Sequence, residues 1–516
     1  MSRQTKRANR RRQARTSRSR EKTLPQLPWA EIRTSYSALE PLKEKDLDLI
    51  HDASMTILEQ HGIEVLSQQV KERFEEIGAK VDKNSGIVRI GRDKILEIIE
   101  SAPNSFTLTP RNPNRQLEVG GNQIHFGMVS GPPNVHDCIR GRRPANFEDY
   151  QSLVKLGQAF NAIHFFGNQT IAPIDLPPNT RHLDTYRSSL MLSDKVFAAV
   201  PIGRDRVRDA VEMVALARGL SLKELALSPS LLGNININSP RKLDDAMSDA
   251  ALALAEYGQA TIVTPFTLMG AMAPVTLGAA LAQQNAEALF CIAMIQLFFP
   301  GSPVVYGGFT SNVDMRSGAP TFGTPENGKA NLVGGQLARR YGIPYRSSGC
   351  NASNIADAQA VYETQMSCWS AMLGRANLLY HAAGWLEGGL VASFEKVVID
   401  VEILQHMSSF FSKPAINQEE LALDSIGSVA PGGHFFGTKH TLERYETAFY
   451  NPILSDWQNN ESWAESGSKD TTRRATDIWQ SIIKDFEPPK LEQGRQDAIN
   501  EYVDARKQEI QSDKDS

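Results

Sequence analysis

The spacing of apolar residues along the chain changes character near residue 145. Beyond that point, short and nearly continuous apolar runs alternate with longer segments whose apolar residues recur at helical spacing. Runs of the first kind are typical of parallel strands that are buried on both faces of a sheet. The expected strands are residues 163–168, 196–200, 231–237, 261–266, 303–306, 343–348 and 377–381.

Helical segments separate these strands at nearly regular intervals. The expected helices are residues 147–159, 186–193, 204–218, 244–257, 277–299, 327–341, 358–373 and 395–410. Seven strand–helix repeats favour a TIM-type (β/α)8 barrel of the α/β class. A doubly wound sheet is less consistent with the pattern, since no GxGxxG motif follows the first strand. The pattern for an eighth strand is weaker, and residues 434–436 are its candidate.

The rest of the chain suggests extensions on both sides of this barrel. The predicted division is a basic disordered tail at 1–22, an α+β N-terminal extension at 23–145, a barrel catalytic domain at 146–450 and a helical C-terminal extension at 451–516. Within the N-terminal extension we expect helices at 43–61, 68–77 and 91–101. Residues 117–126 are expected to form a hairpin that turns at Gly120-Gly121.

Composition narrows the class of protein. The chain has 516 residues, of which 41% are hydrophobic and 22% charged, as in ordinary globular proteins. No segment approaches the ~18–20 apolar residues of a membrane span, so we expect no membrane contact. The four cysteines are widely separated and lack CxxC spacing, which argues against a disulfide framework or a zinc centre. We therefore expect a cytoplasmic protein without a bound metal.

Positive charge is concentrated at the start of the chain. Residues 1–22 hold ten basic side chains and a single acid, Glu21. The tail has no apolar core of the kind found in secretory signals. A transit peptide or a nucleic-acid-binding arm are alternatives, but a solvated, disordered tail is the favoured interpretation, with contact to the acidic body or a part in association as open roles. Nucleic acid is not the expected partner, and we expect a homo-oligomer.

In a barrel, the residues that follow each strand face the active site. Here amides, hydroxyls and aromatic rings dominate, without a carboxylate pair, an HExxH motif or a phosphate-binding glycine loop. Such a site suits a small organic cation held against aromatic faces, although rings at these positions also pack between a barrel and its helices. The candidate substrate-binding residues are Asn168, Asn236, Phe266, Tyr306, Phe309, Arg346, Asn351, His381 and Trp385.

Two further features invite a chemical interpretation. Cys350 follows a strand and is a candidate nucleophile, although a lone cysteine is more often a small core or loop residue. A glycine-rich segment holds His434 and His440, and it can be a lid, a partner surface or a metal site. Two histidines without a carboxylate are weak evidence for a metal.

Five short motifs together resemble the trimethylamine:corrinoid methyltransferase superfamily. They are Gly127-Met128-Val129-Ser130-Gly131-Pro132, Val305-Tyr306-Gly307-Gly308-Phe309, Tyr341-Gly342-Ile343-Pro344, Gly349-Cys350 through Asp357-Ala358-Gln359-Ala360, and Pro431-Gly432-Gly433-His434-Phe435. The resemblance extends from about residue 40 to 480. It implies a βα barrel that moves a methyl group from an amine nitrogen to the Co(I) corrinoid (cobalamin) of a partner protein. The loop Gly432, Gly433 and His434 is then expected to face that corrinoid protein.

The resemblance also bears on the substrate. Archaeal trimethylamine enzymes of this superfamily carry pyrrolysine where this chain has Cys350, which implies a non-pyrrolysine member similar to glycine betaine:corrinoid methyltransferase. A quaternary nitrogen leaves as a neutral tertiary amine and needs no proton, so a site poor in acids and bases suffices. The amides of Asn168, Asn236 and Asn351, or Arg346, would hold a carboxylate, and Cys350 would leave space. Trimethylamine or another methylamine, a Cys350 nucleophile in another reaction, and a nucleic-acid-associated protein remain as alternatives.

Overall fold

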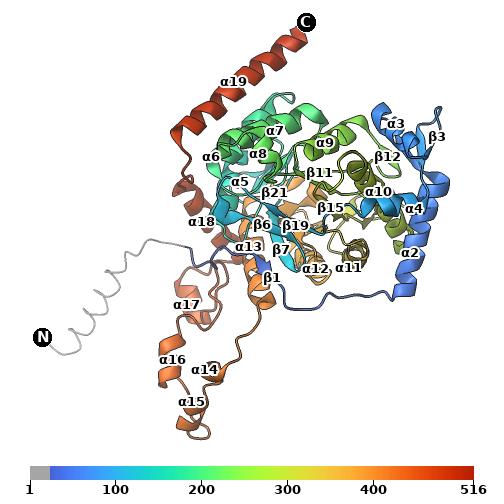
Figure 1. Cartoon of the computed structure of the whole chain (residues 1–516). Helices are drawn as coiled ribbons and strands as arrows, with labels where there is room; N and C mark the ends of the chain where they lie inside the picture. The colour runs from blue at the N-terminus through green and yellow to red at the C-terminus, as the bar shows by residue number, and fades with distance from the viewer. Residues whose placement is uncertain (1–23, 516) are drawn as a thin grey trace, which may run out of the picture.

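The computed structural model describes residues 24–515, and a curled eight-stranded sheet lies at its centre (Figure 1). The predicted tail at 1–22 lies outside the described residues. All neighbouring strands pair in parallel except β1, which is antiparallel to β7. The strand order is β1 (Ile32–Arg33), β7 (Gln123–Met128), β19 (Leu378–Ala383), β18 (Tyr345–Ser348), β15 (Val304–Gly307), β13 (Ala260–Val263), β11 (Leu232–Ile235) and β10 (Ala198–Ala199).

Phe165 lies between the two ends of this run of parallel strands. It forms parallel bridges with Gly127 of β7 and with Val196, which precedes β10. The amide of Met128 donates to the carbonyl of Phe165 at 3.2 Å, and the amide of Phe166 donates to that of Val196 at 2.9 Å. The strand expected at 163–168 is therefore reduced to these bridges.

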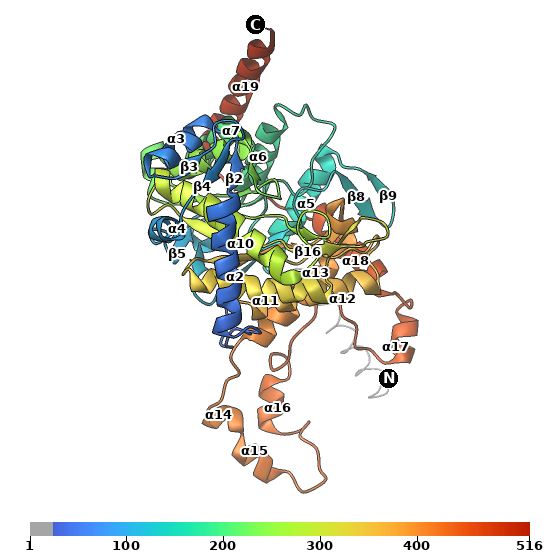
Figure 2. The ribbon, with the colours of Figure 1, turned by 90° about the vertical axis from the view of Figure 1, so that its right-hand side faces the viewer.

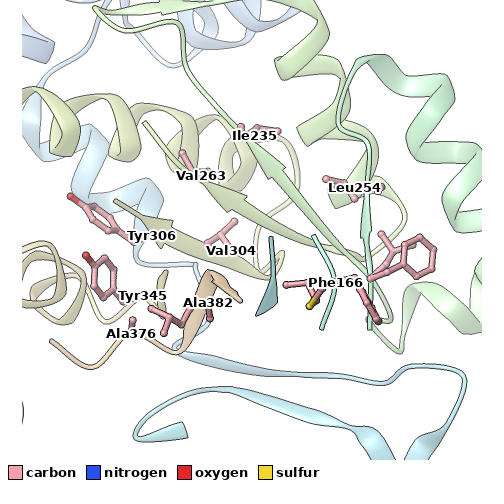
Figure 3. Close-up of a cluster of buried hydrophobic side chains, with 14 of the residues drawn as sticks. Phe166, Ile235, Leu254, Val263, Val304, Tyr306, Tyr345, Ala376 and Ala382 are labelled. Carbon is pink, nitrogen blue, oxygen red and sulfur yellow. The ribbon is translucent and has the colours of Figure 1, made fainter. Parts of the chain in front are cut away.

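The two faces of the strands contribute to different clusters of buried side chains. Outward-facing residues such as Ile235, Val263, Val304 and Tyr306 belong to the large cluster that the helices cover (Figure 3). Residues on the concave face form a second cluster, which contains Phe165, Val196, Ala198, Leu232, Ala260, Ile262, Val305, Leu378 and Tyr380. Because successive side chains alternate between faces, one strand supplies both clusters.

Helices cover the convex face of the sheet at the places that the sequence predicts. They are α5 (Phe147–Ala159), α6 (Arg181–Leu192), α7 (Gly203–Arg218), α9 (Asp245–Glu256), α10 (Leu277–Phe298), α11 (Pro325–Arg340), α12 (Ala358–Leu373) and α13 (Phe394–Phe411). Several begin at capping residues: the side chains of Asp244, Thr324 and Asp357 each accept a hydrogen bond from the first turn. These caps fix where each connecting loop ends.

The N-terminal part packs against α10, on the outer side of the helix layer. It contains α2 (Glu44–Thr56), a π-helical turn (Ile57–His61), β2 (Ile63–Val65), α3 (Gln68–Glu76), β3 (Lys80–Val81), β4 (Ile87–Arg89) and α4 (Arg92–Ile99). Strands β2, β3 and β4 form a small sheet with β12 (Lys242–Leu243). α2 and α4 lie on α10, so most of α10 is buried on all sides.

The hairpin expected over residues 117–126 is wrong. β6 (Leu117–Gly120) pairs with β5 (Ser105–Leu108), whereas β7 pairs with β1 and β19. All six residues of β7 are buried, so this strand belongs in the central sheet rather than in an edge ribbon. Leu108, Leu117 and Val119 instead join the cluster on the concave face.

Shorter elements occur in the loops, including the loops at the carboxyl ends of the strands. They are a 3-10 turn (Pro113–Arg115), β8 (Asn134–Asp137), β9 (Gly141–Pro144), α8 (Leu222–Ala226), β14 (Leu268–Met269), β16 (Ser311–Val313), β17 (Pro320–Thr321), β20 (Trp385–Leu386), a 3-10 turn (Glu387–Gly389) and β21 (Val391–Ser393). Near the C-terminus, α18 (Thr471–Lys484) packs on α13 and α5, and α19 (Gln493–Asp515) packs on α6 and α7. Within residues 24–515, no helix has the length and apolar character needed to cross a membrane.

The candidate for an eighth strand, residues 434–436, is also wrong. These residues are exposed and belong to no strand. They lie in an arm, residues 412–470, that projects from the body and carries α14 (Gln418–Leu421), α15 (Leu423–Ser428), α16 (Lys439–Arg444) and α17 (Asn460–Glu465) (Figures 1 and 2). The Pro431-Gly432-Gly433 run before them disfavours a strand, and β7 takes a place in the parallel sheet instead. The predicted domain boundaries stay a prediction.

Candidate functional site

Aromatic side chains gather at the carboxyl ends of β13, β15 and β19. We call Phe266, Phe309, Phe322, His381 and Trp385 the aromatic cluster. The ring centre of Phe309 lies 5.0 Å from that of Phe266 and 5.1 Å from that of Phe322. The rings of His381 and Trp385 are 4.3 Å apart, and the Trp385 ring meets Phe309 edge-on at 6.2 Å. Four members, all but Phe322, were predicted from the sequence.

A buried arginine borders this cluster. Arg346 is only 1% exposed, and its guanidinium lies 5.1 Å from the ring centre of Phe309 and 4.8 Å from that of Tyr380. Burial lowers the pKa of Arg346 to about 10, so the side chain stays charged at neutral pH. Among the ion pairs of the described residues, none involves this guanidinium. A buried charge without a counter-ion is costly, which indicates that an anion completes the site.

Three polar groups beside the cluster lack a hydrogen-bond partner. They are Nε of Arg346, Oγ of Ser348 and the hydroxyl of Tyr380. Arg346 and Ser348 lie two residues apart on β18 and share one face, and Ser348 is paired in register with Tyr380 of the neighbouring β19. Burial raises the pKa of Tyr380, which keeps its hydroxyl protonated. All three groups can donate, and an ionised carboxylate is a ligand that only accepts.

His381 lines the same site, and its imidazole is uncharged. Its backbone has a left-handed φ of 55°, and its Nδ1 accepts the amide hydrogen of Ser130 at 3.2 Å. The ring therefore carries its proton on Nε2. Burial and the charge of Arg346 hold the pKa of His381 well below its usual value. The imidazole thus adds no second positive charge beside Arg346.

Cys350 follows β18 but lacks the environment of a nucleophile. It is 1% exposed, and burial raises the pKa of its thiol well above the usual value. A reactive cysteine needs the opposite shift, because the thiolate is the nucleophile. Within residues 24–515, no group of three or more His, Cys, Asp or Glu side chains is placed to hold a metal ion.

Two of the predicted site residues, Tyr306 and Asn351, have hydrogen-bond partners that give them a structural role. The hydroxyl of Tyr306 donates to Oδ1 of Asn285 at 3.0 Å, and its ring faces the helix layer beside Tyr345 (Figure 3). Asn351 is fully buried, and its amide donates to the backbone carbonyl of Trp385 at 2.5 Å. The structure thus places Tyr306 outside the aromatic cluster and Asn351 behind it.

The remaining predicted residues lie farther from the aromatic cluster or behind it. Asn168 accepts a hydrogen bond from the hydroxyl of Ser130, the residue that contacts His381 through its amide. Asn236 is exposed and accepts from the amide of Asn234 at 3.4 Å. The loop of Gly432, Gly433 and His434 lies on the projecting arm, and its contact with a corrinoid protein stays a prediction.

Sequence reasoning missed two residues that the structure adds, Phe322 and Tyr380. Phe322 sits in the long connection between β15 and α11, directly after the short strand β17, which the sequence pattern did not predict. Tyr380 lies within β19, and its alternation with Leu378 was the available signal that both face the same side. Ser348 closes β18 two residues after Arg346 and lay among the small polar residues expected near the site.

A buried ion pair supports the cluster from behind. Lys396 and Asp400, one turn apart on α13, form a salt bridge, and both are buried. Lys396 also donates to the hydroxyl of Thr364 at 2.8 Å, and Asp400 accepts the amide hydrogen of Gly384 at 2.8 Å. Gly384 precedes Trp385, so this pair fixes the backbone that carries the indole.

The chain has extensive similarity to characterised proteins. The model of the family described as trimethylamine methyltransferase (MTTB) matches residues 7–511. A glycine betaine methyltransferase of Desulfitobacterium hafniense (strain Y51) is 35% identical over 472 residues, which cover 91% of this chain and 97% of that protein. Trimethylamine methyltransferase MttB of Desulfitobacterium hafniense (strain DSM 10664 / DCB-2) is 28% identical over 462 residues, 89% of this chain and 92% of that protein.

Solved structures include a more distant likeness. The monomethylamine methyltransferase MtmB of Methanosarcina barkeri aligns with a TM-score of 0.46 and 11% identity, over 89% of this chain and 97% of that chain. The family match, by contrast, spans nearly the whole sequence. It confirms the resemblance that the five motifs indicated, and the chain belongs to the trimethylamine methyltransferase (MTTB) family.

Proposed function

We propose that this protein moves a methyl group from a quaternary amine that bears a carboxylate, such as glycine betaine, to the Co(I) corrinoid of a partner protein. The observation that carries the proposal is Arg346, a buried cation whose Nε has no partner and which no described carboxylate neutralises. The family and both relatives above are named as methyltransferases, and this chain is a methyltransferase.

A carboxylate group distinguishes glycine betaine from trimethylamine, the two substrates in the names of the relatives. Trimethylamine has no anionic group, so it would leave the guanidinium of Arg346 without a counter-ion. Glycine betaine carries a carboxylate that can accept from Arg346, Ser348 and Tyr380 together. The more similar of the two relatives is the one named for glycine betaine. Substrate chemistry and similarity thus support the same choice.

The ammonium group fits beside the carboxylate. In glycine betaine a single methylene separates the quaternary nitrogen from the carboxylate. A carboxylate bound to Arg346 therefore leaves the ammonium beside Phe309, whose ring lies 5.1 Å from that guanidinium. Aromatic faces attract quaternary ammonium groups, and Trp385 and Phe266 extend the aromatic surface around Phe309.

The methyl transfer needs little acid–base catalysis from the side chains of the protein. The C–N bond breaks with both electrons on nitrogen, which leaves dimethylglycine with a neutral amine and an ionised carboxylate. Co(I) supplies the electron pair of the new Co–CH3 bond and becomes Co(III). No proton moves, in agreement with neutral His381 and protonated Cys350. The residues of the site orient the methyl group and exclude water.

A closed barrel would suit this role. Phe165 bridges β7 on one side and Val196, next to β10, on the other, so eight strand positions follow one another around a ring. The concave-face cluster draws residues from all of these positions except β7 and β18. We infer a closed (β/α)8 barrel whose interior is packed below the site, with the partner's corrinoid approaching the carboxyl ends of the strands.

The compartment follows from the chemistry. Co(I) is a strong reductant, and all four cysteines are free. We infer a cytoplasmic enzyme on that basis. A nucleophilic role of Cys350 is the weaker alternative, because burial keeps it a thiol and no base contacts it among the side-chain hydrogen bonds of the described residues.

The test is methyl transfer to free Co(I) cobalamin, followed by absorbance. The panel compares glycine betaine, choline, which replaces the carboxylate by a hydroxymethyl group, and trimethylamine. We expect glycine betaine to be the best substrate by at least tenfold in kcat/KM and dimethylglycine to be its product. Equal or faster transfer from trimethylamine would overturn the assignment, and transfer from none of the three would overturn the substrate class.

A further inference from the structure

The arm, residues 412–470, departs from the usual distribution of apolar side chains. No side chain between residues 412 and 453 is buried. Large apolar residues nevertheless recur along the arm with exposed fractions between 58% and 82%. Six of them are Ile416, Leu423, Phe436, Leu442, Phe449 and Trp457. So many exposed large apolar side chains on one segment indicate an interaction surface.

The arm has little internal packing of its own. Helices α14, α15 and α16 have four to six residues each and contain no buried residue. Helices of this length are marginal in water and depend on packing against another surface. Figures 1 and 2 show from two directions that α14, α15 and α16 stand away from the body of their own chain, whereas residues 453–455 return to Glu402 of α13. The surface that covers these three helices therefore has to come from elsewhere.

The body carries an apolar groove at the base of the same arm. The groove has a volume of about 1200 Å³ and runs along α12; Ile355, just before this helix, and Tyr362 and Met366 within it are exposed by 54%, 62% and 45%. Trp369 lines one end and packs on Phe410, just before the arm begins. Residues 470–472, where the arm returns, line it as well. The groove thus lies between the two points where the arm joins the body.

We propose that the arm of one chain covers the α12 groove of a second copy, in a two-fold symmetric dimer. In such a dimer the same patch on each chain must be self-complementary, and here an apolar arm and an apolar groove adjoin on one chain. Each of the six arm side chains offers on the order of 100 Å², and their apolar neighbours bring the arm close to the ~800 Å² per partner of a stable interface. The apolar character fits a permanent homodimer better than a transient contact with a corrinoid protein.

The mass of the full-length protein in solution is the first measurement, by size-exclusion chromatography with light scattering at micromolar concentration. We expect twice the chain mass of 57.0 kDa. The arm variant Phe436→Ser/Phe449→Ser and the groove variant Tyr362→Glu/Met366→Glu should both run as monomers with unchanged circular dichroism. The control Leu227→Ser removes an 88% exposed apolar side chain elsewhere and should stay dimeric.

Cys138 supplies a second measurement without mutation of the interface. It is exposed in the single chain and lines the α12 groove. Maleimide should label it at least tenfold more slowly in the wild-type dimer than in the monomeric arm variant. A wild-type monomer, a dimer that survives either double substitution, or equal labelling rates would each overturn the proposal. A monomer that binds the corrinoid protein through the arm would assign the surface to that other partner.

Discussion

Asn351 and Trp385 are joined by two reciprocal hydrogen bonds. The side-chain amide of Asn351 donates to the backbone carbonyl of Trp385 at 2.5 Å, and the indole Nε1 of Trp385 donates to the backbone carbonyl of Asn351 at 3.1 Å. The first residue follows β18 and the second begins β20, so the pair ties together the loops after two neighbouring strands of the sheet. Asn351 therefore positions the indole, and we do not expect it to touch the substrate.

Asn351→Asp tests this positioning role. The substitution replaces the donating amide by an acceptor that faces the carbonyl of Trp385, in a fully buried place. We expect a loss of about 1–3 kcal/mol in the free energy of unfolding and a shifted Trp385 fluorescence. Both are measured by urea titration, with the single-indole signal isolated by comparison with Trp385→Phe. An unchanged stability with a raised KM for glycine betaine would instead make Asn351 a direct substrate contact.

Arg346 should decide substrate choice. Arg346→Gln leaves no cation for the carboxylate, and we expect kcat/KM for glycine betaine to fall by about a hundredfold or more, equivalent to about 3 kcal/mol. Arg346→Lys should lose less, because it keeps a charge but not the planar fork. The steady-state rate of cobalamin methylation measures both.

The control for Arg346 is Arg340, whose charge forms ion pairs at the protein surface. Arg340 pairs with Glu44 and Asp48 far from the aromatic cluster, and Arg340→Gln should leave kcat/KM within about twofold. Choline, which lacks the carboxylate, should react equally slowly with wild type and Arg346→Gln. An equal loss for choline and glycine betaine would show that Arg346 acts on folding rather than on the carboxylate.

Phe309 should contribute through attraction to the ammonium. Its ring contacts Arg346 and all four other members of the aromatic cluster. Phe309→Leu keeps an apolar side chain but removes the ring face, at an expected cost of about 1–2 kcal/mol in binding. The measurement compares glycine betaine with 3,3-dimethylbutyrate, an isostere in which carbon replaces the charged nitrogen. Wild type should bind glycine betaine about tenfold tighter, and the variant should lose that preference. If the variant weakens both ligands equally, the ring acts only by packing.

The elements of the fold were largely predictable where one physical rule dominated. α5 and α12 have the predicted bounds, and parallel strands such as β13 and β15 were visible as apolar runs because both of their faces are buried. β7 was misassigned because Gly120-Gly121 resembles a hairpin turn, while its true partners β1 and β19 are distant in the sequence. Long-range pairing of this kind leaves no local signal.

The sequence pattern predicted which strand ends form the site, but it did not predict the direction in which each side chain points. Tyr306 and Arg346 both belong to strands of the parallel sheet, yet Tyr306 faces the helices and Arg346 faces the aromatic rings. Which face a residue takes depends on the register of the strand, and a one-residue difference reverses it. Phe322 reaches the cluster from a long connection, where periodicity gives no guidance.

Cys350 should neither react with thiol reagents nor be needed for catalysis in the native protein. Burial raises the pKa of this thiol, and Cys291 and Cys368 are likewise buried with raised pKa values. At pH 7 we expect a thiol reagent to label Cys138 alone, and Cys350→Ala to keep kcat within about twofold. Mass spectrometry of the labelled protein and the cobalamin assay give the two readouts. Protection of a labelled Cys350 by glycine betaine, together with an inactive alanine variant, would restore the nucleophile hypothesis.

His164 should make the folded state sensitive to acid. Its Nδ1 accepts the amide hydrogen of Phe126 at 2.9 Å and its Nε2 lies 3.1 Å from the carbonyl of Ala30, so the buried ring is neutral. Burial lowers the pKa of His164 to about 3, whereas an unfolded histidine has a pKa of about 6.5. Between these values the unfolded chain binds the extra proton, so stability is complete above about pH 6.5 and is lost as pH falls toward 3.

His164→Gln isolates that contribution. The glutamine amide offers one acceptor and one donor, as the neutral imidazole does, but it cannot take up a proton. Between pH 7 and pH 5 we expect the wild type to lose about 2 kcal/mol more than the variant in the free energy of unfolding, measured by urea titration at each pH. The exposed His61→Gln variant serves as the control and should follow the wild type. Parallel stability curves for His164→Gln and wild type would mean that the buried ring takes up its proton without unfolding.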